Sequence, residues 1–339
     1  MKLIKVEDSV GQVLCHDMTQ IIPKVTKDAR FRKGYVVTKE DIPILLSMGK
    51  ENIYIWENQE GMLHENEAAE ILCEICMGSG FKKSEVKEGK IELIANVNGM
   101  LEVDSQSLNE INSLGEMMIA SRHGNFPVKA GDKCVATRVI PLVIEEEKMK
   151  IAKKIAKGRP LFNILPYKKK KIGVVTTGSE VYEGRISDKF TPVIGKKLEE
   201  YDNCIDEHII CNDDSEMIEN SIEKFLASGC DLIICTGGMS VDPDDRTPLA
   251  IKNTSDEIIT YGAPVIPGAM LMLAYTNNGK AIVGLPGCVM YSKKTIFDLV
   301  LPRLICDVRI ESRDLSKLGE GGLCLSCDTC TYPNCGFGK

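Results

Sequence analysis

The stretch KIGVVTTGSE (residues 171–180) decides the fold of this chain, because it combines a buried apolar strand with a small-residue turn. The same combination returns in DLIICTGGMS (residues 231–240) and in KAIVGLPG (residues 280–287). A further strand is expected at 206–211, and helices at 190–201, 215–228 and 290–300. Strands that alternate with helices in this way form right-handed βαβ crossovers. The sequence therefore predicts an α/β fold with a doubly wound, mostly parallel sheet.

The pattern along the chain indicates several domains, and 339 residues are enough for two or three cores. The segment 145–171 is rich in charge and contains two prolines, which marks the main boundary. The predicted parts are a small N-terminal α/β module at 1–60, an α+β module with its connector at 61–165, the α/β domain at 166–308 and a cysteine-rich tail at 309–339.

Charge and hydropathy exclude several classes of protein. The net charge is -7 and the isoelectric point is near 5.4, so no basic field attracts nucleic acid. No apolar run reaches the roughly 18 to 20 residues that span a bilayer, and the first residues lack the apolar segment of a signal peptide. We therefore expect a cytoplasmic protein without membrane or nucleic-acid partners, in which most of the fourteen cysteines are reduced.

The turns after the three strands should meet at one edge of the sheet, where such folds bind ligands. One such turn is explained by strand-to-helix geometry as readily as by function, but three together favour an oxyanion site of N–H groups and hydroxyls. The residues expected to bind the phosphate-bearing ligand are Thr176, Thr177, Gly178, Ser179, Thr236, Gly237, Gly238, Met239, Ser240, Leu285, Pro286 and Gly287. Neither a P-loop nor a strand-associated GxGxxG occurs, which excludes a standard NTPase or nicotinamide site.

Acidic residues accompany these loops at Glu180, Asp188, Asp213 and Asp245. Carboxylates beside a phosphate site repel the ligand unless a hard cation such as Mg²⁺ joins the two. The combination therefore predicts Mg²⁺ as a cofactor. For Asp213, which precedes the helix expected at 215–228, the alternative role of a helix cap stays open.

Four short motifs follow one another in a recognisable order. They are TTGSE at 176–180, DDRTP at 244–248 after the TGG turn, PG at 267–268 and LPG at 285–287. In these motifs the segment 170–304 resembles the molybdopterin-binding domain of the molybdenum cofactor biosynthesis proteins, in a divergent MoeA-like molybdopterin molybdotransferase branch.

The resemblance implies that the chain acts in molybdenum cofactor biosynthesis, binding molybdopterin or its adenylated form and inserting molybdate with Mg²⁺. It adds Asp188, Pro267 and Gly268 to the ligand-binding residues. The residues that it assigns to catalysis are Glu180, Asp213 and Asp245. Besides molybdopterin or its adenylate and molybdate, a molybdoenzyme partner and a homo-oligomer are compatible with the family.

Two other functions stay open. The segments PGAM at 267–270 and LPGCV at 285–289 depart from the family pattern, and with the cysteine-rich tail they favour a non-catalytic carrier or sensor of molybdopterin or the finished cofactor. The third possibility is a nucleotide pyrophosphatase, because the resembling domain also occurs in competence-damage-inducible-like proteins.

The tail carries four cysteines within its last sixteen residues, in the pattern C-x2-C-x2-C-x4-C. Thiolates at this spacing suit an iron–sulfur cluster or a zinc ion, so the expected metal ligands are Cys324, Cys327, Cys330 and Cys335. The alternative is a flexible, reduced tail without metal. Because the tail contains little apolar sequence, we expect it to order only around a metal and its removal to leave the α/β domain folded.

Overall fold

A computed structural model of the chain describes residues 2–22, 26–55, 60–240, 242 and 245–339. Two compact units are formed. The first consists of Met1–Ile94, Asp104–Arg122 and Lys133–Asn163, and the second of Ala95–Val103, His123–Asp132 and Ile164–Lys339. The finer four-part division stays a prediction from the sequence.

In its described residues, the first unit consists of short antiparallel sheets and four α-helices. The two-stranded sheets pair β1 (Lys2–Lys5) with β4 (Asn52–Ile55), β2 (Met18–Ile22) with β3 (Thr26–Phe31), and β5 (Met62–His64) with β12 (Val143–Glu145). A four-stranded sheet has the order β6 (Phe81–Lys83), β7 (Lys90–Ala95), β11 (Lys133–Val139), β9 (Met117–Ser121). The helices are α1 (Ile42–Ser47), α2 (Glu65–Cys76), α3 (Ser105–Asn112) and α4 (Glu146–Ile155), with short 3₁₀ turns η1 (Val6–Asp8) and η2 (Lys39–Asp41).

The second unit is built on a six-stranded sheet. Its order is β15 (Glu207–Cys211), β14 (Ile172–Thr177), β16 (Leu232–Thr236), β19 (Ala281–Leu285), β18 (Met272–Tyr275), β17 (Glu257–Tyr261). The first four strands are parallel, and β18 and β17 add to the sheet as antiparallel strands. The predicted mostly parallel α/β fold is confirmed, although the two antiparallel strands were not predicted.

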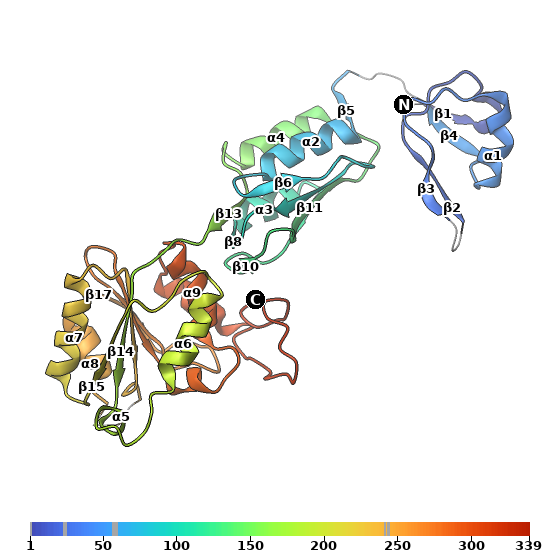
Figure 1. Cartoon of the computed structure of the whole chain (residues 1–339). Helices are drawn as coiled ribbons and strands as arrows, with labels where there is room; N and C mark the ends of the chain where they lie inside the picture. The colour runs from blue at the N-terminus through green and yellow to red at the C-terminus, as the bar shows by residue number, and fades with distance from the viewer. Residues whose placement is uncertain (1, 23–25, 56–59, 241, 243–244) are drawn as a thin grey trace. The chain divides into compact units, whose positions relative to one another are not determined.

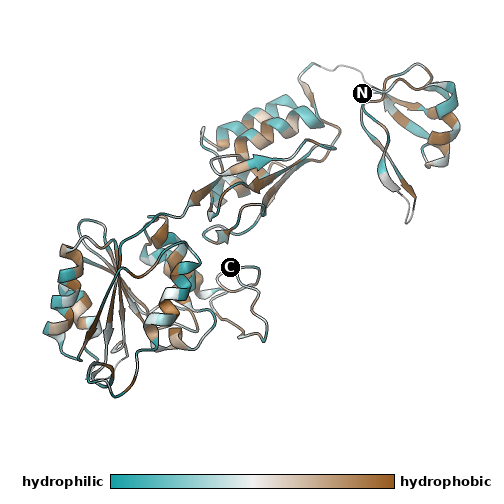
Figure 2. Cartoon of the chain, viewed as in Figure 1, coloured by the Kyte–Doolittle hydropathy of each residue, from teal (hydrophilic) through white to brown (hydrophobic). Residues whose placement is uncertain are grey.

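Helices cover both faces of this sheet (Figure 1). On one side lie α6 (Phe190–Glu199) and α9 (Ile296–Ile305), and on the other α7 (Ser215–Ala227) and α8 (Thr247–Thr254). Adjacent residues of one strand enter opposite cores, since Val174 packs with the α6 and α9 side and Val175 with the α7 and α8 side. The central strands β14, β16 and β19 are therefore buried along their whole length and largely hydrophobic (Figure 2).

The predicted helix at 290–300 is wrong at its start, because α9 begins only at Ile296. The chain first forms a 3₁₀ turn, η3 (Gly287–Met290). Thr295 then caps the helix, accepting a hydrogen bond from the N–H of Phe297 at 3.2 Å, while Asp298 accepts one from the N–H of Thr295 at 2.8 Å. This reciprocal capping box sets the helix start more strongly than the apolar pattern does.

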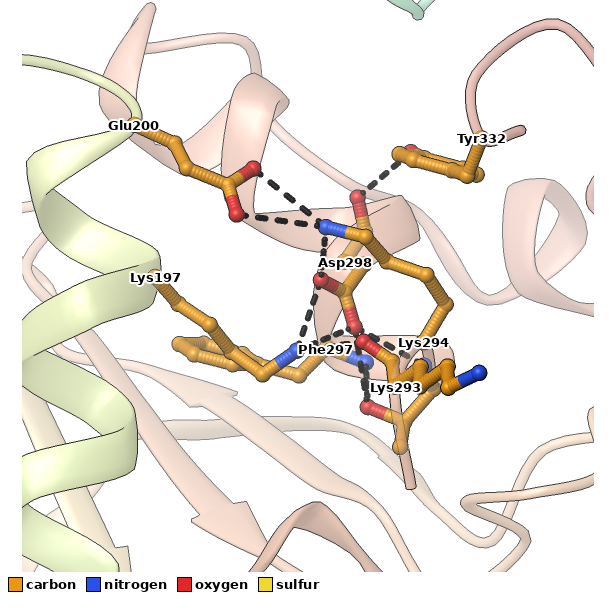
Figure 3. A network of polar contacts seen from close by, with 8 residues as sticks. Lys197, Glu200, Lys293, Lys294, Phe297, Asp298 and Tyr332 are labelled. Carbon is orange, nitrogen blue, oxygen red and sulfur yellow. Dashed lines mark hydrogen bonds and ion pairs between the residues drawn. The ribbon is translucent and has the colours of Figure 1, made fainter. Parts of the chain in front are cut away.

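The tail is part of the second unit and packs on its core, so the expectation that it has too little apolar sequence to pack is wrong. The remaining elements of this unit are α5 (Ser179–Tyr182), α10 (Ser312–Ser316), η4 (Lys317–Gly319) and a small sheet of β10 (Pro127–Val128), β8 (Gly99–Val103) and β13 (Phe162–Pro166). Phe337 is 4% exposed and belongs to the same core as Phe126 and Leu299. The Tyr332 hydroxyl donates to the carbonyl oxygen of Asp298 at 2.9 Å (Figure 3). Aromatic packing and hydrogen bonds thus attach the tail to the core of this unit.

Candidate functional site

A cavity of about 390 Å³ opens at the edge of the sheet where the parallel strands end. Two of the predicted loops form it, one after β16 and one after β19. The lining residues are Phe190, Gly237, Gly238, Met239, Ser240, Asp245, Met270, Pro286, Gly287, Cys288, Met290 and Tyr291. This is the location at which a doubly wound sheet binds its ligand.

Seven of these residues were expected from the sequence, and five were missed. The missed ones are mostly apolar: Phe190, Met270, Cys288, Met290 and Tyr291. Cys288 directly follows the LPG turn, and Met290 and Tyr291 come within four residues of it. Their closeness to a predicted ligand-binding turn could have indicated that they line the cavity. Phe190 and Met270 had no such signal, because only the packing of α6 and of the segment before β18 brings them to the cavity.

The first loop supports its neighbours and does not line the cavity. Thr176 and Thr177 are buried at the end of β14. The Thr177 hydroxyl is 3.1 Å from that of Thr247 on α8, and the Thr176 hydroxyl is 3.0 Å from Nε2 of His208 on β15. These hydroxyls therefore join adjacent elements, and a role in binding ligand for residues 176–179 stays a prediction.

Asp188 is the centre of a polar cluster behind the first loop. Its carboxylate accepts hydrogen bonds from the N–H of Phe190 at 2.7 Å and from the hydroxyl of Thr176 at 3.2 Å. Burial alone would raise the pKa of Asp188, but hydrogen bonds from Thr191 and from the backbone outweigh it and lower the pKa. Asp188 is therefore an ionised anchor that positions Phe190, the first residue of α6, at the cavity.

The three acids assigned to catalysis occupy different surroundings. The Asp213 carboxylate accepts hydrogen bonds from the N–H and hydroxyl of Ser179, both at 2.8 Å, so it holds the first loop against the end of β15. Glu180 is exposed on α5, and Asp245 lines the cavity. Asp244, in the same DDRTP motif, lies outside the described residues. Of the three, Asp245 is the acid that lines the cavity.

The fit of Mg²⁺ follows from these positions. Among the described residues, no three Asp, Glu, His or Cys side chains lie close enough together to hold one metal ion. Mg²⁺ commonly takes only one or two protein carboxylates and completes its shell with water and substrate phosphate. The Asp245 carboxylate, which lines the cavity beside the glycine turn, could serve as such a single protein ligand. This mode does not need a metal site made of protein side chains alone, and the described residues contain none.

Pro267 and Gly268 support the site from behind. The carbonyl oxygen of Pro267 accepts from the N–H of Ile296 at 3.1 Å, and a Cβ on Gly268 would lie 2.5 Å from Cγ2 of Ile296. The glycine is therefore needed for close packing on the start of α9. Neither residue lines the cavity, although Met270, two residues further on, does.

Replacing Gly237 by alanine is expected to destabilise the α/β unit and to weaken ligand binding. Gly237 has φ of +84°, and a Cβ there would lie 2.2 Å from the carbonyl oxygen of Thr177. The backbone strain alone costs roughly 1–3 kcal/mol, and the clash separates the two loops further. Gly229→Ala is the matched control, because Gly229 has φ of +87° but no atom lies within 4 Å of the place that its Cβ would take. Denaturant unfolding that gave equal losses for both variants would contradict the close contact between the loops.

Comparison with known families assigns the domain. Residues 173–305 match the family described as probable molybdopterin binding domain, and residues 3–57 match a domain of unknown function (DUF8806). The first match includes β14, β16, β19 and the turns that follow them. The second unit therefore contains a segment that matches the probable molybdopterin-binding domain, as the resemblance of its motifs implied, whereas the MoeA-like branch is not confirmed by this match.

Among curated proteins the chain is similar to CinA-like proteins. It is 37% identical over 75 residues to the CinA-like protein of Mycobacterium sp. (strain MCS), covering 22% of this chain and 18% of that protein. It is 36% identical over 75 residues to the CinA-like protein of Mycobacterium tuberculosis (strain ATCC 25618 / H37Rv), covering 22% and 17%. The matched part is thus less than a fifth of the length of these relatives.

Solved structures with a similar domain include two molybdopterin biosynthesis proteins. The enzyme MoaB from Thermus thermophilus has 20% sequence identity and a TM-score of 0.35, covering 40% of this chain and 91% of that one. The Mog protein from Mycobacterium ulcerans has 18% identity and a TM-score of 0.35, covering 41% and 99%. Separately, no helix in the described part of the chain is long and apolar enough to cross a membrane.

Proposed function

We propose that this chain acts in molybdenum cofactor biosynthesis and binds molybdopterin or its adenylated form in the cavity after β16 and β19. The observation that carries the proposal is the glycine turn Gly237–Gly238 beside Asp245, inside the segment that matches the molybdopterin-binding family. Both glycines line the cavity and have positive φ, a backbone conformation in which N–H groups can form a site for an oxyanion. The apolar side chains of Phe190, Met290 and Tyr291 supply a surface for the pterin.

The proposed reaction is molybdate insertion. When bound, Mg²⁺ would neutralise phosphate charge, and Asp245 is the residue that would hold it. Asp213 keeps Ser179 and the first loop in place, while Glu180 lies exposed at the start of α5. In this proposal Asp245 contacts the metal and ligand, whereas Asp213 and Asp188 position the loops around them.

A second candidate is a carrier or sensor of the cofactor that performs no reaction. The observation that favours it is the use of Asp188 and Asp213 in hydrogen bonds within the protein, which leaves Asp245 as the acid at the cavity among the described residues. A nucleotide pyrophosphatase is the third candidate, in keeping with the match to CinA-like proteins. A molybdoenzyme partner and a homo-oligomer belong to the same set of proposals.

Replacing Asp245 by alanine tests the site. Removing this carboxylate should weaken Mg²⁺-dependent binding of adenylated molybdopterin by about tenfold or more, or at least roughly 1.4 kcal/mol. Isothermal titration with and without Mg²⁺ measures the loss. Asp256→Ala is the control, because Asp256 accepts a hydrogen bond from the N–H of Asn277 at 2.7 Å and does not line the cavity. Equal affinity in the wild-type and Asp245→Ala chains would rule out the assigned role.

Product analysis separates the three candidates with the same preparation. Release of AMP that depends on molybdate and adenylated molybdopterin indicates insertion. Tight binding with no product indicates a carrier or sensor, and cleavage of a nucleotide pyrophosphate without molybdate indicates a pyrophosphatase. Whichever activity or binding is observed, it should be strongly reduced in Asp245→Ala if the cavity after β16 and β19 is the site responsible.

A further inference from the structure

The four cysteines of the tail line a single second cavity of about 540 Å³. Cys324, Cys327, Cys330 and Cys335 are all free thiols. The tail supplies most of the wall, and the segment before α9 supplies the rest through Tyr291, Lys293 and Lys294. The four free thiols thus place soft ligands on the wall of one cavity.

The frame of this cavity is fixed at both ends. The N–H of Cys324 donates to the carbonyl oxygen of Ile266 at 2.8 Å, and the N–H of Gly338 donates to that of Gly321 at 2.9 Å. Phe337 is buried in the core between these ends and the helix α9. The segment that carries the cysteines is therefore a closed loop with anchored ends, and its conformation does not depend on packing of the thiols alone.

The middle of the loop is held by a lysine. Lys293 Nζ donates to the carbonyl oxygens of Asp328 at 2.7 Å and of Cys327 at 3.2 Å. Cys327 and Cys330 themselves are exposed, so their thiols have no role in the apolar core. Lys293 lines the same cavity as the four cysteines, and its positive charge favours an anionic group there.

The spacing of the cysteines and the shared cavity favour a cluster over a single ion. No three Cys, His, Asp or Glu side chains of the described residues lie close enough together to hold one ion, and this includes the four tail cysteines. In a cuboidal [4Fe–4S] cluster each thiolate binds its own iron, so the four sulfurs surround a larger body. Three cysteines separated by two residues each, as at 324, 327 and 330, are also the run that holds such clusters in bacterial ferredoxins. We propose that the tail binds a [4Fe–4S] cluster in this cavity.

The cluster cavity adjoins the candidate ligand site. Tyr291 lines both cavities. It follows η3, which comes directly after the LPG turn of the ligand cavity, and it precedes Lys293, which lines the cysteine cavity. A cluster held by the tail would thus lie next to the molybdopterin-type site, with Tyr291 between the two. This consequence rests on the proposed function, whereas the cluster itself does not.

The test is metal analysis of the full-length chain, purified without oxygen and reconstituted with ferrous iron and sulfide. We expect about four iron atoms and about four acid-labile sulfides per chain, with an absorption band of thiolate-to-iron charge transfer and an electron paramagnetic resonance signal after reduction. No molybdopterin is needed, so a failure of the proposed function leaves this result unaffected.

Variants define the ligands. Cys327→Ala and Cys330→Ala should each lose most of the iron and the spectrum, while circular dichroism stays unchanged because both side chains are exposed. Cys204→Ala is the matched control, since Cys204 is an exposed free thiol that does not line the cavity. One zinc per chain without sulfide, an intact chain that takes up no iron, or full iron content in both tail variants would each overturn the proposal.

Discussion

Replacing Phe337 by alanine is expected to destabilise the second unit by roughly 3–5 kcal/mol, the usual loss for a buried phenylalanine. Its ring is 4% exposed and shares a core with Phe126 and with Leu299 of α9. The ring centroid lies 6.4 Å from that of Tyr332, which in turn lies 5.9 Å from that of Phe126. Truncation would leave a cavity beneath α9 and expose the apolar surface that the tail covers.

Hydrogen exchange of peptides from β14 and β16 during urea unfolding measures this loss within the second unit. Leu325→Ala is the control from the same tail, because Leu325 is 77% exposed and its removal should change stability by less than about 0.5 kcal/mol. Deletion of residues 323–339 should destabilise the unit at least as much as Phe337→Ala. If the deleted chain kept full stability, the tail would be an independent appendage, as its sequence alone suggested.

Asp298→Ala is expected to cost roughly 3–5 kcal/mol, because it leaves a buried ammonium group without its counter-charge. Asp298 and Lys197 are 3% and 8% exposed, and Lys197 Nζ lies 2.8 Å from both carboxylate oxygens (Figure 3). Lys294 adds an ion pair at 3.1 Å, and the same carboxylate caps α9 through the N–H of Thr295. The Asp298 side chain thus joins α9 to α6 through Lys197, and to the segment just before α9 through Lys294 and Thr295.

The control in this network is Glu200→Ala. Glu200 pairs with Lys294 at 3.3 Å but is 54% exposed, so its loss should cost less than about 1 kcal/mol. The double variant Lys197→Met with Asp298→Leu should recover part of the stability lost in Asp298→Ala, because no unpaired charge remains buried. Similar unfolding midpoints for Asp298→Ala and Glu200→Ala would show that the buried pair does not stabilise the unit.

Part of the candidate site was predictable from short motifs. Gly237, Gly238 and Asp245 lie at the cavity because a glycine turn after a parallel strand reaches the ligand edge whatever follows it. The role of Asp213 was not predictable, because it depends on a hydrogen bond to Ser179, which is 34 residues away. Likewise, the Thr177 hydroxyl, which was expected to bind phosphate, lies 3.1 Å from the hydroxyl of Thr247. This contact was not predictable, because Thr247 is 70 residues further along the chain.

By itself the sequence determined the four parallel strands, the helices α6 and α7 and the glycine turns, because apolar periodicity and turn residues act over a few neighbouring positions. The tertiary structure alone decided that Phe337 belongs to the core of the α/β unit, together with Phe126 and Leu299. It also decided that four tail cysteines share a cavity with Tyr291. These features depend on contacts between residues far apart in the chain, and local patterns carry no record of which distant side chains will meet.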